Sequence, residues 1–87
     1  MNRPVSGFVY LVHCPSAHQV KIGFSVDPQD RYLDLERTIP VPICMVACVP
    51  GTTIDEGVLH TKYSQFRKKG EWFSDEIIPE LVEIVGA

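Results

Sequence analysis

Two short runs of β-branched and aromatic residues near the N-terminus constrain the fold most strongly. They are GFVYLVH at residues 7–13 and QVKIGF at residues 19–24, with the turn-forming sequence CPSAH between them. Such residues favour strands, and two strand-like runs joined by a short turn are typical of a β-hairpin. We therefore expect the fold to be built on two antiparallel strands, against which the later elements pack.

A helix is predicted directly after this hairpin. Asp27 can cap the unpaired amides of a helix start, and Pro28 suits the first helical position because its ring fixes a helical φ. The helix should continue to about Arg37 and end at IPVP, residues 39–42, since proline removes a backbone donor and disfavours helical geometry in the residue before it. Its apolar face should carry Tyr32, Leu35 and Ile39.

The next two elements are predicted to be a strand and a helix. ICMVACV at residues 43–49 is continuously apolar, which is typical of a strand covered on both faces, and PG at 50–51 closes it. A helix should begin near Thr53, whose spacing to Glu56 fits a capping box, and continue to about Phe66. The residues expected to face inward are Ile54, Val58, Leu59 and Tyr63.

The C-terminal part is predicted to be a loop followed by a third helix. Gly70 breaks the second helix within RKKGEWF, residues 67–73, and apolar residues at helical spacing indicate an acidic last helix at about residues 75–85. Pro79 fits only within the first turn of that helix. The element order is then ββαβαα, in an α/β (α+β) fold with a small three-stranded sheet flanked by helices. Because the chain is short for two cores, we expect residues 1–87 to form a single domain.

The composition is that of a globular protein, with 45% hydrophobic and 22% charged residues. No apolar stretch approaches the ~18 residues that cross a bilayer, and the N-terminal MNRPVSG lacks the apolar core of a signal peptide. We therefore expect no membrane partner and a cytoplasmic location. The three cysteines are an odd number, so thiols are expected rather than disulfides. Cys44 and Cys48 should be small buried hydrophobes in a strand rather than zinc ligands.

The charge is spread unevenly along the chain. The formal net charge is −3, which is unusual for a nucleic-acid-binding protein. However, residues 1–70 contain eight basic and six acidic residues, a formal charge of +2, whereas the residues after Gly70 contain five acidic residues and no Lys or Arg. A mildly basic body is therefore joined to an acidic C-terminal segment.

A set of short motifs in a fixed order resembles the GIY-YIG endonuclease superfamily, and most closely its compact bacteriophage and bacterial single-domain branch. The matching motifs are Phe8-Val9-Tyr10, Lys21-Ile22-Gly23, Arg31, Glu56-Gly57-Val58-Leu59-His60 and Gly70-Glu71-Trp72-Phe73. Each motif alone is common, but the ordered set spans about residues 7–75. The resemblance implies a GIY-YIG-like fold and a metal-dependent endonuclease that hydrolyses DNA phosphodiester bonds.

The same resemblance implies roles for five catalytic residues. Glu56 would be the ligand of one divalent ion, Mg²⁺ or Mn²⁺, since these ions prefer carboxylate oxygens. Tyr10 would orient the attacking water or accept its proton, and Lys21 beside it would lower the phenol pKa by favouring the charged form. Arg31 would offer two parallel donors to the phosphate. His60, one helical turn after Glu56, would shuttle a proton or orient the metal-bound water.

DNA contacts are expected from a basic run and from an aromatic side chain. Arg67, Lys68 and Lys69 would contact phosphates, and Trp72 would offer a stacking surface. Few side chains remain for reading bases, so either a homodimer or a separate DNA-recognition partner would supply specificity. This choice stays open.

Two departures from the motif pattern keep other functions open. Leu35 stands four residues after Arg31, where many superfamily members have His or Tyr, and their Asn after the metal carboxylate has no counterpart. One alternative is a catalytically weakened module that binds nucleic acid. Another is a regulatory protein-interaction domain whose acidic last helix contacts a protein partner.

Overall fold

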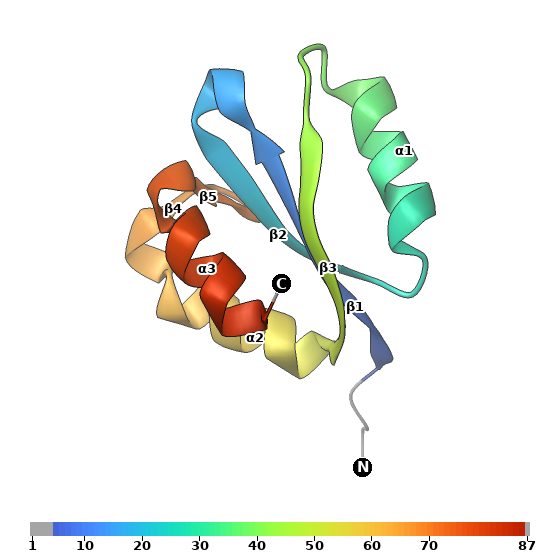
Figure 1. Cartoon of the computed structure of the whole chain (residues 1–87), viewed down its shortest axis with the longest axis vertical. Helices are drawn as coiled ribbons and strands as arrows, with labels where there is room; N and C mark the ends of the chain where they lie inside the picture. The colour runs from blue at the N-terminus through green and yellow to red at the C-terminus, as the bar shows by residue number, and fades with distance from the viewer. Residues whose placement is uncertain (1–4, 87) are drawn as a thin grey trace.

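The computed structural model describes residues 5–86 as an antiparallel five-stranded sheet with helices on both faces (Figure 1). The strands lie in the order β3-β1-β2-β5-β4. They are β1 (Ser6–Cys14), β2 (Gln19–Ser25), β3 (Cys44–Thr52), β4 (Arg67–Lys69) and β5 (Trp72–Ser74). The helices are α1 (Pro28–Thr38), α2 (Thr53–Lys62) and α3 (Ile78–Val85). No helix in this described part is long and apolar enough to cross a membrane.

The predicted N-terminal hairpin is confirmed. β1 and β2 are joined by a 3₁₀ turn, Pro15–Ala17, and their register pairs Tyr10 with Gly23 and Leu11 with Ile22. Because side chains alternate between the two faces of a strand, Leu11 and Ile22 point to one face of the sheet, and Tyr10 and Gly23 to the other. The hairpin therefore supplies side chains to both faces.

The hydrophobic core lies between one face of the sheet and helices α2 and α3. Leu11, Ile22 and Phe73 from the sheet are fully buried there, as is Leu81 from α3. The other core members are Val9, Val20, Ala47, Leu59, Tyr63 and Ile77. This packing fixes α2 over β2, which decides where the polar side chains of α2 are placed.

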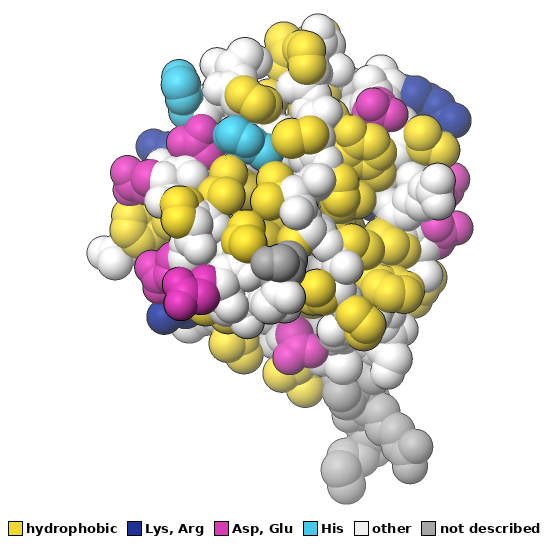
Figure 2. All heavy atoms as spheres, viewed as in Figure 1, with side chains coloured by type: hydrophobic (Ala, Val, Ile, Leu, Met, Phe, Trp, Pro, Cys, Tyr) yellow, Lys and Arg dark blue, Asp and Glu magenta, His cyan; other side chains and the backbone are white. Residues whose placement is uncertain are grey.

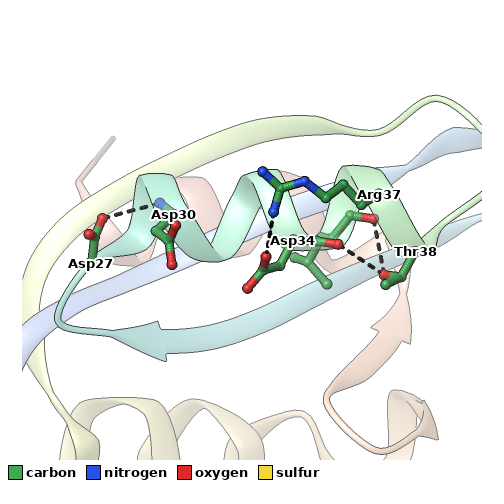
Figure 3. Close-up of polar contacts among 6 residues, drawn as sticks. Asp27, Asp30, Asp34, Arg37 and Thr38 are labelled. Atoms are coloured by element: carbon green, nitrogen blue, oxygen red, sulfur yellow. Dashed lines mark hydrogen bonds and ion pairs between the residues drawn. The ribbon is translucent and has the colours of Figure 1, made fainter.

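Helix α1 packs on the opposite face, and its prediction is confirmed to within one residue. The Asp27 carboxylate accepts a hydrogen bond from the Asp30 amide at 3.1 Å and so caps the helix start. Arg37 pairs with Asp34 at 2.9 Å, and the Thr38 hydroxyl donates to backbone carbonyls of the preceding turn (Figure 3). These contacts join near neighbours on the helix.

The prediction that the third strand is covered on both faces is wrong. β3 is an edge strand that pairs only with β1, and it continues through residues 50–51 to Thr52 instead of closing there. Cys44 and Cys48 are exposed, so the expectation of buried thiols fails for both, while Cys14 is buried. A continuous apolar run cannot distinguish a central strand from an edge strand that is partly covered by loops and helices.

The second helix is capped and ends differently from the prediction. The capping box is formed by Thr52 and Asp55, not by Thr53 and Glu56: the Asp55 carboxylate accepts from the Thr52 amide at 2.7 Å. The α-helix ends at Lys62 and a 3₁₀ turn, Ser64–Phe66, follows.

The helix face that was expected to point inward is also partly wrong. Leu59 and Tyr63 are buried as predicted, but Ile54 and Val58 are each 59% exposed. Hydrophobic side chains accordingly cover much of the face of the molecule seen in Figure 2. A shallow pocket of about 300 Å³ lies beside Val58, between α2, β3 and Ile84 at the end of α3.

The predicted order ββαβαα and the three-stranded sheet are wrong because RKKGEWF is a hairpin rather than a loop. β4 and β5 form it, and Gly70 adopts a left-handed φ of 57° at its turn. A short run of charged residues gives little strand signal. The last helix is confirmed, with a 3₁₀ turn (Asp75–Ile77) before α3 and Pro79 in the first turn of α3.

Candidate active site

Polar side chains converge where β5 stops pairing with β2. The two strands pair only from Gln19 to Lys21 on the β2 side. At the next residue the Ile22 amide donates to the Glu71 carbonyl at 3.0 Å, and the Ile22 carbonyl accepts from Nε2 of His60 at 2.9 Å. Beyond this point the backbone edge of β2 is open. The sheet edge therefore brings α2 and the β4–β5 turn to one place.

Three side chains of types that can bind a metal ion meet at this edge. Glu56, His60 and Glu71 each offer a ligand atom, and these atoms all lie within 4.8 Å of one another. Glu56 and His60 share one side of α2 because they are four residues apart. Glu71 comes from the turn before β5. Glu56 can take part because Asp55, not Glu56, is committed to the helix cap.

Lys21 lies within this group of acids. Its Nζ is 2.7 Å from the Glu71 carboxylate and 5.8 Å from the centre of the Trp72 ring. Of residues 5–86, Lys21 is the charged residue that is buried, at 8% exposure. Burying an ammonium group is costly unless it is paired. The contact with Glu71 therefore offsets the cost of burying the Lys21 ammonium group at the edge of β2.

The two carboxylates differ in their pKa. Burial raises the pKa of Glu56, and the neighbouring Glu71 raises it further. Burial acts to raise the pKa of Glu71, but the hydrogen bond and charge of Lys21, together with smaller contributions from Glu56 and His60, make the net shift downward. Glu71 therefore stays ionised to lower pH than Glu56 does. A further cation would favour the ionised form of Glu56 most.

Tyr10 lies on the sheet face that α1 covers, and it is 1% exposed. Its ring passes directly over Gly23 on β2: a Cβ at Gly23 would be 2.3 Å from a Tyr10 ring carbon. The glycine of the Lys21-Ile22-Gly23 motif is thus required because only a residue without a side chain leaves room for the ring.

The predicted effect of Lys21 on Tyr10 is wrong. Burial raises the pKa of Tyr10, the Arg31 guanidinium opposes this shift, and the charges of Glu71 and Glu56 add to it. Lys21 is instead paired with Glu71. Tyr10 therefore stays a neutral phenol near neutral pH. Arg31 is the cation that acts to lower the pKa of its hydroxyl.

His60 uses both of its ring nitrogens. Because a carbonyl oxygen only accepts hydrogen bonds, Nε2 must carry the proton that is donated to Ile22. A guanidinium only donates, so Nδ1 accepts from Arg67 Nη2 at 3.0 Å. His60 is then neutral, with its one lone pair on Nδ1. Arg67, predicted only as a DNA contact, reaches back into the site.

The remaining predicted contact residues lie around this edge. Lys68 and Lys69 are exposed on β4, the outer strand of the sheet, and Trp72 is half-buried on β5. Arg31 is exposed on α1, and within residues 5–86 it forms no ion pair with a carboxylate. The structure thus places Tyr10 and Arg31 on one side of the sheet edge and Glu56 and His60 on the other.

Glu71 is the site residue that sequence reasoning missed. It was part of the matched motif Gly70-Glu71-Trp72-Phe73 but was given no role. The signal that could have found it is a carboxylate directly after a turn glycine, near three cationic residues. Without the hairpin, nothing in the sequence placed it beside Lys21.

One family model matches the sequence of this chain. The family model described as the T5orf172 domain matches residues 7–86, nearly the whole chain. The chain belongs to the T5orf172 domain family. This family is associated with nuclease-like proteins of bacteriophages and bacteria. No curated protein and no solved structure matches the chain. Every residue of the site described above lies within the T5orf172 domain match.

Proposed function

We propose that this T5orf172 domain is a metal-dependent endonuclease of the GIY-YIG type that hydrolyses DNA phosphodiester bonds. The observation that carries the proposal is the meeting of Glu56, His60, Glu71 and Lys21 at the open edge of β2. Hydrolysis of a phosphodiester needs a positioned water and neutralisation of the charge that develops on the phosphate. These side chains, with Tyr10 and Arg31 across the edge, supply such groups.

The donor atoms fit a divalent ion. Glu56 offers carboxylate oxygens that are not used by the helix cap, and a second carboxylate and an imidazole lie within 4.8 Å. Mg²⁺ and Mn²⁺ both accept such oxygen ligands. When bound by Glu56, the ion would lower the pKa of a coordinated water and neutralise phosphate charge.

The protein side chains would position the reacting groups. The Tyr10 hydroxyl, held over Gly23, would hydrogen-bond the attacking water as a neutral phenol, because its pKa is raised by burial. Arg31 would offer two parallel donors to the scissile phosphate. The Lys21 ammonium, fixed by Glu71, would add positive charge beside the same phosphate.

DNA would approach along the outer strand of the sheet. Lys68 and Lys69 are exposed on β4 and would contact phosphates, whereas Trp72 is half-buried, with Lys21 over its ring. Trp72 therefore offers a smaller stacking surface than a fully exposed aromatic would. Base recognition would come from a homodimer or from a separate DNA-recognition partner.

A plasmid-nicking assay with MgCl₂ or MnCl₂ tests the proposal. Wild-type protein should nick supercoiled DNA, and EDTA should stop the reaction. Glu56→Gln should lower the rate by about 10³-fold and Tyr10→Phe by about 10²-fold, the usual range for charge stabilisation and for a positioned proton-transfer group. Glu83→Gln, on the exposed side of α3, is the charge-matched control and should leave the rate unchanged. Equal activity in all four proteins would mean a contaminating nuclease.

A binding module without cleavage is the second candidate, and two observations favour it. Leu35 stands on α1 where a polar side chain would be expected, and Arg67 already occupies Nδ1 of His60. This candidate predicts salt-dependent DNA binding by electrophoretic mobility shift with no nicking at any metal concentration. Absence of binding at low salt would exclude both candidates and favour a protein-interaction role.

A further inference from the structure

The candidate site holds more potential metal ligands than the single carboxylate of Glu56. They come from α2 and from the turn before β5. Among residues 5–86, Glu56, His60 and Glu71 are the group of His, Cys, Asp and Glu side chains whose ligand atoms lie close enough to hold one ion. Glu56 alone would suffice for a metal held mainly by waters and substrate. The structure adds a second carboxylate and an imidazole at the same place.

His60 makes a hydrogen bond of the kind that histidine metal ligands commonly make. Imidazole ligands usually donate their other ring N–H to a carbonyl or carboxylate, which fixes the ring and directs the free lone pair at the metal. Here Nε2 donates to the Ile22 carbonyl at 2.9 Å, on the open edge of β2. The lone pair of Nδ1 is thereby presented at a fixed angle. The backbone of β2 holds the ring in place independently of the carboxylates.

A positively charged side chain already donates a hydrogen bond to Nδ1 of His60. Arg67 Nη2 lies 3.0 Å from Nδ1 of His60, and the guanidinium lies 5.7 Å from the centre of the Phe73 ring. Arg67 is exposed at the start of β4, so its side chain can leave this position without disturbing the core. A cation at Nδ1 is what a bound metal ion would replace.

We propose that Glu56, Glu71 and Nδ1 of His60 together bind one divalent ion of the Mn²⁺ class, and that Arg67 occupies the nitrogen ligand while the metal is absent. This inference rests on the proposed function, since it assigns further ligands to the same site. An imidazole ligand favours transition-metal ions over Mg²⁺, which prefers oxygen ligands alone. The Glu71 carboxylate would then have two partners: Lys21 pairs with one of its oxygens, and the ion would bind the other.

Metal and DNA binding are coupled through Arg67. When the ion binds Nδ1, the Arg67 guanidinium is released toward β4, where Lys68 and Lys69 are exposed to phosphates. A phosphate that binds Arg67 conversely frees Nδ1 for the ion. Because such coupling is reciprocal, DNA should raise the affinity for metal by the same factor as metal raises the affinity for DNA.

A Mn²⁺ titration without DNA tests the ligand set. Free MnCl₂ is followed by electron paramagnetic resonance, and Trp72, the single tryptophan and the neighbour of Glu71, gives a second readout by fluorescence. Glu56→Gln and Glu71→Gln should each weaken Mn²⁺ binding more than ~100-fold, beyond the effect of losing an outer-shell partner. Glu83→Gln is the charge-matched control and should bind as the wild type does.

Lys21→Met separates ligation from ion pairing. This change removes the Lys21–Glu71 contact but leaves the carboxylate, so Mn²⁺ should bind at least as tightly as to the wild type. If Lys21→Met and Glu71→Gln weaken binding equally, Glu71 acts only through its ion pair and the inference is overturned. Circular dichroism of each variant establishes that the fold is retained.

Arg67→Met tests the resident cation. Mn²⁺ affinity should rise several-fold in Arg67→Met and less in Lys68→Met, which removes the same charge one residue away. Equal affinities in these two variants would overturn the role of Arg67. If Mn²⁺ binds the wild type and Glu71→Gln equally but not Glu56→Gln, the inference fails while the proposed function stands. If Mn²⁺ binds none of these proteins, both fail.

Discussion

Helices α1 and α2 lie on opposite faces of the same sheet, and they differ in which side chains they leave half-buried. On α1, Leu35 is half-buried and the charged residues are exposed, with Arg37 and Asp34 paired with each other (Figure 3). α2 exposes Ile54 and Val58 to solvent at 59% each. Its half-buried side carries Glu56 and His60 instead.

Packing alone does not account for the polar side chains on the half-buried side of α2. Placing Glu56 and His60 on a half-buried side requires partial desolvation of polar groups, which costs free energy unless other groups compensate. The charge of Lys21 offsets part of this cost for Glu56, and Arg67 and the Ile22 carbonyl hydrogen-bond His60. Local rules of helix burial tend to be broken at functional sites. α2, with Ile54 and Val58 exposed, departs from those rules further than α1, where Leu33 is exposed.

The sharpest test of this contrast uses two arginines of α1. Arg31 faces Tyr10 and the candidate site, whereas Arg37 pairs locally with Asp34. Arg31→Lys should lower the nicking rate by about 10²-fold, because Lys cannot offer two parallel donors to a phosphate. Arg37→Lys should leave the rate unchanged. Equal rates in the two variants would mean that α1 serves the fold alone.

The second prediction concerns the glycine that supports Tyr10. In Gly23→Ala the added Cβ would meet the Tyr10 ring at 2.3 Å, so the ring must move. We expect a loss of about 1 to 3 kcal/mol in the free energy of unfolding, the range for overpacking a core. In Gly57→Ala, the control on α2, no atom lies within 4 Å of the new methyl group, and stability should rise by up to about 1 kcal/mol. Urea denaturation measures both.

A third prediction addresses Tyr63, where α2 ends. Its hydroxyl is buried without a hydrogen-bond partner within residues 5–86, so Tyr63→Phe should raise stability by about 1 kcal/mol. Burial, with the nearby Glu80, raises the pKa of Tyr63 to about 12. The unfolded chain loses this proton near its ordinary value of 10, before the folded protein does. Wild-type stability should therefore fall between pH 10 and 12, and this tyrosine's share of the fall should be missing in Tyr63→Phe.

Adjacent acids on α2 give a fourth test that separates capping from metal binding. Asp55→Asn weakens the capping box with Thr52 and should cost about 1 kcal/mol of stability, with Mn²⁺ binding retained. Glu56→Gln should do the reverse, lowering Mn²⁺ binding with little loss of stability. Thermal unfolding and metal titration of both variants check this. If Glu56→Gln destabilised the protein as much as Asp55→Asn, Glu56 would be a structural residue.

The sequence predicted the elements whose signals are local. The turn CPSAH, the cap at Asp27 and Pro79 in the first turn of the last helix all follow from the chemistry of neighbouring residues. β4 and β5 were missed because three basic residues have no strand propensity, and their pairing depends on β2, far away in the chain. Strand pairing of this kind is not encoded within any short window.

The candidate site was predicted in part for the same reason. The motif order identified Glu56 and His60, which lie on one helix, and Tyr10, Lys21 and Arg31 through the resemblance. It could not show that Glu71 pairs with Lys21 across 50 residues. The capping box was misplaced by one residue because Thr52 and Thr53 are both suitable caps with an acid three positions later.

The smallest predicted effect concerns the exposed apolar residues of α2. Ile54→Thr and Val58→Thr should each change the free energy of unfolding by no more than about 0.5 kcal/mol, because surface substitutions bury or expose little new area. Leu59→Ala, one position along but buried, should cost about 2 to 5 kcal/mol. Urea denaturation of the three variants compares them directly. A large loss in Val58→Thr would mean that this side chain is covered in solution, by a second copy or a partner, and that α2 buries its apolar side after all.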